Sequence, residues 1–89
     1  MEEKYKVNAA VQEKYGTNSI RGKASLMGDR WVSVRSTDFM DPGTEVETLL
    51  FLKEPERVTG EVRWILAEPT EDRIVYRMGI WLTPDKPVS

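Results

Sequence analysis

Alternation of apolar and polar residues with a period of two runs through most of this 89-residue chain. The clearest example is residues 74–82, where Ile, Tyr, Met, Ile and Leu alternate with Val, Arg, Gly and Trp. Successive side chains of a β-strand point to opposite faces, so this pattern predicts strands with one buried face. A helical period of 3.6 residues is absent from the sequence. Six strands are expected, over residues 5–12, 20–26, 31–36, 45–53, 58–66 and 74–82.

Six short strands without a helix favour an all-β fold in which the sheet closes on itself. An open sheet of this size would leave two unprotected edges and one uncovered face. We therefore predict a small six-stranded antiparallel β-barrel, as a single domain over residues 1–83. Residues 84–89 contain Pro84 and Pro87, which cannot sit inside a helix, so a flexible C-terminal tail is expected.

One turn in the chain has a specific signature. Asp41-Pro42-Gly43-Thr44 places proline at the second turn position and glycine at the third. Proline fixes the φ angle that the second position needs, and glycine tolerates positive φ at the third. The segment therefore predicts a type II turn leading into the fourth strand.

The composition removes most classes of enzyme. The chain has no Cys and no His, so it lacks a thiolate nucleophile, the commonest general base and the commonest transition-metal ligands. We expect no catalysis, no metal site and no cofactor. The net charge of −2 argues against binding a nucleic-acid polymer. The longest apolar run, residues 49–52, is too short for a membrane span, and a cytoplasmic location without membrane contact is expected.

Three sequence blocks, in order, resemble the PilZ domain family. These blocks are Pro42-Gly43-Thr44-Glu45-Val46, then Gly60-x-Val62-x-Trp64, then Tyr76-Arg77-x-Gly79-Ile80. The resemblance covers roughly residues 20 to 82. It implies a small β-barrel, and for many members a role as a bacterial receptor for cyclic di-GMP. Family members commonly add a C-terminal helix, which residues 83–89 do not supply.

The ligand-binding motifs of that family are missing from this chain. The family's D/N-x-S-x-x-G pattern falls on Leu26, Gly28 and Trp31, and its R-x-x-x-R pattern falls on Glu2 and Lys6. Lysine does not replace the planar, bidentate guanidinium of arginine without loss. A second register, Ser19-x-x-Gly22, leaves too many residues before the turn at Pro42-Gly43 for one strand and a loop. We therefore expect cyclic di-GMP binding to be weak or lost.

Two functions remain open. The first is an adaptor that acts through protein–protein interaction, because family members without the motifs resemble docking adaptors for motility or secretion machinery. The second is a cyclic di-GMP sensor that uses non-standard basic residues, namely Lys4, Lys6, Arg21 and Arg30. An RNA-binding barrel is less favoured, because no strand shows a paired aromatic stacking platform.

The three tryptophans are the side chains that stand out. Trp64 shares a predicted strand face with Val62 and Leu66, so it is expected in the core. Trp31 and Trp81 lie on the faces opposite their strands' aliphatic residues. Tryptophan is enriched at interface hot spots, so we predict a docking patch formed by Trp31 or Trp81 with Phe39 and Met40. Without a C-terminal helix, weak self-association through an uncovered barrel mouth or apolar strip is also expected.

Overall fold

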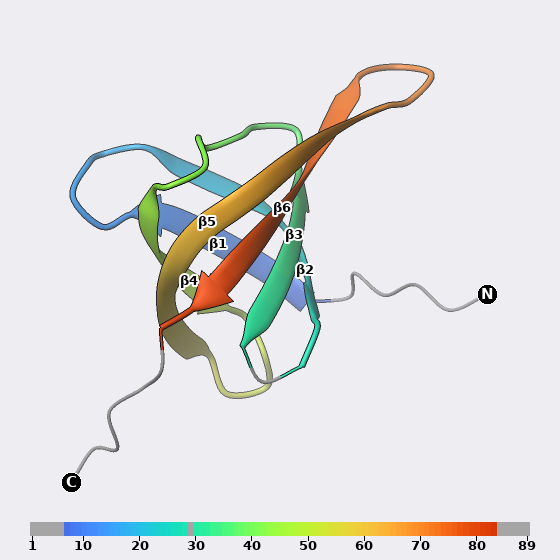
Figure 1. The fold of residues 1–89 in the computed structure, drawn as a ribbon. Coiled ribbons are helices and arrows are strands. Elements are labelled where there is room, and N and C mark those ends of the chain that lie inside the picture. Colours follow the sequence, from blue (N-terminus) through green and yellow to red (C-terminus); the bar gives the residue numbers. More distant parts are fainter. Residues whose placement is uncertain (1–6, 29, 84–89) are drawn as a thin grey trace, which may run out of the picture.

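The computed structural model describes residues 7–28 and 30–83, and it confirms the predicted six-stranded antiparallel barrel (Figure 1). No helix occurs in these residues. The strands follow the order β1-β2-β3-β6-β5-β4 around the closed sheet. Their bounds are β1 Val7–Glu13, β2 Ser19–Leu26, β3 Trp31–Ser36, β4 Glu45–Leu50, β5 Glu56–Pro69 and β6 Ile74–Leu82.

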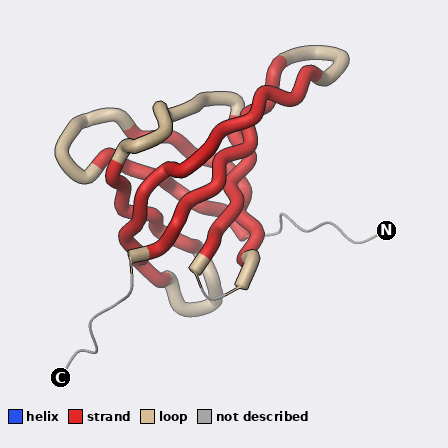
Figure 2. The backbone as a smooth tube through the Cα atoms, in the orientation of Figure 1, coloured by secondary structure: helices blue, strands red, loops and turns tan. Residues whose placement is uncertain are grey.

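The first strand closes the barrel because it pairs on both of its edges. Ala9 lies opposite Gly22 of β2 on one side and opposite Leu50 of β4 on the other. The fourth strand ends at Leu50, three residues earlier than predicted. The fifth strand is longer than predicted. Its first part pairs with β4, and its last part runs beyond the barrel as a hairpin with β6 (Figures 1 and 2).

Alternating side chains from all six strands fill the barrel. The most completely buried of them are aliphatic and come from different strands, as the period-two pattern predicts. Met40, from the loop after β3, is also buried, at 2% exposed. The core consists of Ala9, Val11, Ile20, Ala24, Val32, Val34, Met40, Val46, Leu50, Val62, Met78 and Ile80.

The predicted type II turn is present. Gly43 has φ of +93°, in the region that favours glycine. The backbone N–H of Thr44 donates to the Asp41 carbonyl at 3.2 Å, which closes the turn. The Thr44 hydroxyl donates to the same oxygen at 2.7 Å. The turn is tied to β5, since the N–H of Gly43 donates to Val62 O at 2.6 Å and Val62 N–H donates to Thr44 O at 2.9 Å.

A β-bulge in β5 breaks the alternation between Val62 and Trp64. Val62 lies opposite Ile80, but Trp64 lies opposite Gly79, so two steps on β5 match one step on β6. Val62 therefore points into the core, whereas Trp64 points outward and is 37% exposed. The prediction that Trp64 lies in the core with Val62 and Leu66 is wrong for this reason; Leu66 is 49% exposed.

A buried hydroxyl in the core provides a stability prediction. The Thr48 side chain is fully buried, and its Oγ1 has no hydrogen-bond partner. An unsatisfied buried polar atom costs about 1–3 kcal/mol of desolvation. We expect Thr48→Val to raise the free energy of unfolding by about 1 kcal/mol, measured by chemical denaturation. A lower free energy of unfolding would show that the hydroxyl finds a partner in solution.

None of the described residues belongs to a helix long and apolar enough to cross a membrane.

Candidate binding face

A tryptophan ring lies on a glycine on the outside of the barrel. Trp64 of β5 lies opposite Gly79 of β6, and a methyl group at Gly79 would lie 2.2 Å from Cε2 and Nε1 of the indole. Only a residue without a side chain leaves room for the ring there. Gly79 therefore allows the indole to pack directly against the backbone of β6. The backbone covers one side of the ring, and another part of the ring stays exposed.

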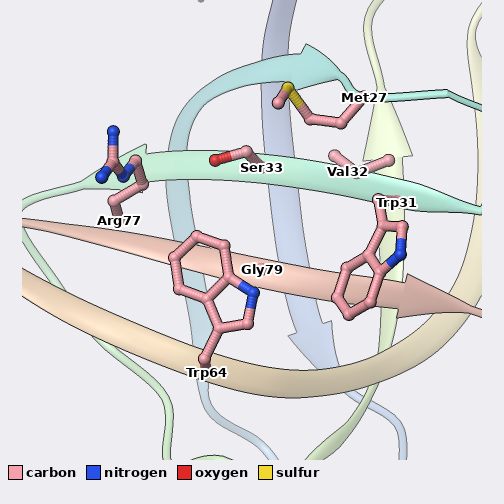
Figure 3. A pocket seen from close by; sticks show the side chains of 7 residues that line it. All are labelled: Met27, Trp31, Val32, Ser33, Trp64, Arg77 and Gly79. Carbon is pink, nitrogen blue, oxygen red and sulfur yellow. The ribbon is translucent and has the colours of Figure 1, made fainter.

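The ring of Trp64 forms one wall of a surface groove of about 460 Å³. Trp31, at the start of β3, stands on the other side of Gly79 (Figure 3). Small residues form the floor, because Ser33 and Gly79 lie opposite each other in the β3–β6 ladder and both are buried. This groove is lined by Met27, Trp31, Val32, Ser33, Trp64, Arg77 and Gly79.

Trp31, which forms the second wall of the groove, packs against another tryptophan. Trp31 and Trp81 are opposite each other in the ladder, and their rings meet edge to face with centroids 4.6 Å apart. The guanidinium of Arg63 lies over the Trp81 ring, 5.5 Å from its centroid. Edge-to-face packing and the cation–π contact both hold the rings in place. The aromatic side of the groove is therefore ordered before any partner binds.

A row of basic side chains crosses the sheet beside the groove. Lys23 of β2 lies opposite Arg35 of β3, which lies opposite Arg77 of β6. Glu68 pairs with both arginines, at 3.7 Å from Arg35 Nε and 3.4 Å from Arg77 Nη2. One carboxylate between two guanidiniums leaves this row positive. Arg77 Nε is buried and has no hydrogen-bond partner.

The basic row continues into a second hollow of about 470 Å³, farther along β2 and β3. Its lining includes Arg21, Lys23, Arg35, Ser36 and Thr37. We refer to the groove, the basic row and this hollow together as the binding face. It lies on the outer surface of β2, β3, β6 and the second half of β5.

The predicted ligand residues are not all brought together. Arg21 lines the basic hollow, but Arg30 precedes β3 at the other end of the sheet. With Lys23 opposite Arg35, Arg21 falls level with residue 37, so about 20 Å separates it from Arg30 along the strands. Lys4 and Lys6 lie outside the described residues. The four predicted ligand residues therefore do not form one site, because Arg21 and Arg30 lie too far apart.

The predicted docking patch is also divided. Trp31 and Trp81 are in contact at one end of β3, whereas Phe39 follows the other end and packs against Tyr76, with ring centroids 5.1 Å apart. Phe39 is exposed, as predicted. The prediction for Met40 is wrong, because its side chain is buried in the barrel core.

Arg77 and Gly79 were missed as site residues by sequence reasoning. The alternation in residues 74–82 does place both on the face of Trp81. Nothing in the sequence, however, signals the bulge that brings Trp64 onto that face. Among the described residues, no three acidic side chains converge in a way that could hold a metal ion.

Comparison with known proteins finds no matching family model, no matching curated protein and no matching solved structure.

Proposed function

We propose that this protein is a non-catalytic, PilZ-like adaptor that docks an acidic segment of a protein partner on its binding face. The observation that carries the proposal is Trp64, which a β-bulge and Gly79 hold on the outside of the barrel beside a basic row. A cytoplasmic location and a part in bacterial motility regulation belong to the same proposal.

The exposed indole supports a role in docking. A tryptophan that only stabilised the barrel would gain most from complete burial. Trp64 instead presents part of its ring to solvent, next to a groove large enough for an apolar side chain. Ordered tryptophans beside small pockets are typical of interface hot spots.

The charges of the binding face indicate an acidic partner. The whole chain carries a net charge of −2, yet four basic residues lie on this face against one carboxylate, Glu68, that pairs with the basic row. A local positive potential attracts acidic segments and speeds their association. The basic residues of the face are Arg21, Lys23, Arg35 and Arg77.

Cyclic di-GMP is the second candidate, favoured by one feature. Arg21, Lys23 and Arg35 surround the basic hollow, and guanidiniums bind phosphates bidentately. The separation of Arg30 from Arg21 counts against tight binding. We therefore expect this ligand to bind weakly or not at all.

Parallel NMR titrations of the ¹⁵N-labelled chain distinguish the two functions. The first probe is a short blocked peptide with one phenylalanine between aspartates, and its controls replace aspartate by lysine or phenylalanine by serine. We expect the acidic peptide to shift the indole N–H signals of Trp64 and Trp31 saturably, and to bind less tightly as salt rises. No shift at millimolar peptide, or an equal response to the lysine peptide, would contradict docking. Saturable shifts of Arg21, Lys23 and Arg35 with cyclic di-GMP would favour the sensor.

A further inference from the structure

The hairpin formed by the end of β5 and the start of β6 projects from the barrel as a two-stranded arm (Figures 1 and 2). One edge of β5 pairs with β4, and this pairing ends at Val62. The backbone of Val62 forms hydrogen bonds with Gly43 and Thr44. Beyond the bulge, from Trp64 to Pro69, the backbone ladders within the described chain run to β6 alone. The opposite edge of β5 is therefore an unpaired strand edge, of the kind that pairs readily with another strand.

The direction of the backbone groups on this edge follows from the turn of the hairpin. Thr70 N–H donates to Arg73 O at 2.7 Å, so Thr70 faces β6. Residues two apart in an antiparallel strand turn their N–H and C=O to the same side. Ile65, Ala67 and Pro69 therefore face the free edge. Pro69 fits this assignment, because a strand tolerates proline where its nitrogen faces no partner.

The free edge of β5 is self-complementary, so the same edge of a second copy can pair with it. Suppose two copies meet antiparallel about a two-fold axis at Leu66. Ile65 of each copy then lies opposite Ala67 of the other, and these two pairs exchange four backbone hydrogen bonds. Leu66 meets its own copy as the closely spaced, non-hydrogen-bonded pair. Pro69 has no N–H and so ends the ladder.

The side chains along this edge also suit a second copy. Residues 64–67 read Trp-Ile-Leu-Ala, so the central pairs are apolar on both faces of the new sheet. Leu66 is 49% exposed in the single chain and would be covered. Trp64 would face Glu68 of the other copy across the strands. The indole itself lies toward Gly79, on the side of β5 away from this edge, so the groove stays open.

We infer that the β5 edge of the arm is a homodimerisation site, at which two copies of this chain add strand to strand through residues 65–67. The contact is small, well under the size of a stable standard interface. A dissociation constant on the order of 0.1 mM is expected. The dimer would carry two binding faces, so a partner with two acidic segments would gain avidity.

Sedimentation equilibrium of the full chain, at concentrations from about 10 μM to 1 mM, tests this site together with two matched variants. Leu66→Lys places a charge at the two-fold axis, and Ile74→Lys makes the same change on β6 at a residue that is 48% exposed. We expect a concentration-dependent dimer for the wild type and for Ile74→Lys, and at least tenfold weaker dimerisation for Leu66→Lys. Thermal melts check that both variants fold.

An NMR experiment on a mixture of labelled and unlabelled chains tests the register. A non-hydrogen-bonded antiparallel pair brings its two Cα atoms to about 4.5 Å, so an intermolecular contact between the Hα protons of the two Leu66 residues is expected. A strictly monomeric mass at 1 mM overturns the inference, and so does equal weakening by both lysine variants. Peptide binding at the groove is measured below the dimer concentration range, so its failure would concern the docking proposal alone.

Discussion

Trp64→Ala is expected to abolish docking of the acidic peptide while the barrel still folds. Truncating a central tryptophan at an interface costs 2 kcal/mol or more of binding free energy, which is a loss of about 30-fold in affinity. The ring lies outside the core, so its removal opens no internal cavity. The lost contact with Gly79 should lower the free energy of unfolding by about 2 kcal/mol. Peptide titration followed by amide NMR, with thermal melts of the same samples, measures both quantities.

Ile74→Ala is the matched control for this experiment. Ile74 is also an exposed apolar residue on the β5–β6 hairpin, but it does not line the groove. We expect its affinity for the peptide to equal that of the wild type. Unchanged binding by Trp64→Ala would show that the groove is not the docking site. Equal losses in both variants would indicate that the peptide contacts the arm in general.

Gly60→Ala is expected to destabilise the barrel strongly. Gly60 is buried in β5, and a Cβ atom there would lie 2.4 Å from the Trp81 carbonyl oxygen and 3.0 Å from Ile80 Cγ2. Because the first contact is with backbone, no side-chain rotation relieves it, and the β5–β6 ladder must shift. Overpacking of this kind costs about 2–3 kcal/mol. For a domain of this size, the melting temperature should fall by roughly 10–20 °C.

Gly16→Ala separates this collision from the general cost of adding a methyl group. The atoms nearest to a Cβ at Gly16 belong to the Glu13 side chain, with Oε1 at 1.9 Å. That carboxylate is the end of a long, half-buried side chain that accepts a hydrogen bond from Asn18 N–H at 3.3 Å, and a side-chain rotation moves it away at the cost of that one bond. We expect a change of less than about 1 kcal/mol in the free energy of unfolding, from the same denaturation curves. Similar destabilisation by both substitutions would contradict the backbone collision at Gly60.

The sequence was informative about strands and much less so about the site. Alternation located all six strands, and Pro42-Gly43 identified the type II turn. The errors fall at strand ends, at the bulge in β5 and in the loop after β3, where the side chain of Met40 is buried in the core. β5 extends to Pro69 because those residues pair with the start of β6, and this pairing is a long-range event that the local pattern does not contain.

The sequence by itself determined the class of fold, because a period of two through most of the chain predicts strands, and so short a chain protects them best by closing the sheet. Tertiary structure decided the composition of the binding face. One extra residue at the bulge turned Trp64 outward onto Gly79, and strand register aligned Lys23, Arg35 and Arg77 while separating Arg21 from Arg30. Register depends on which strands pair. Alternation along a strand shows which side chains share a face of the sheet, but it does not show which strand lies beside it.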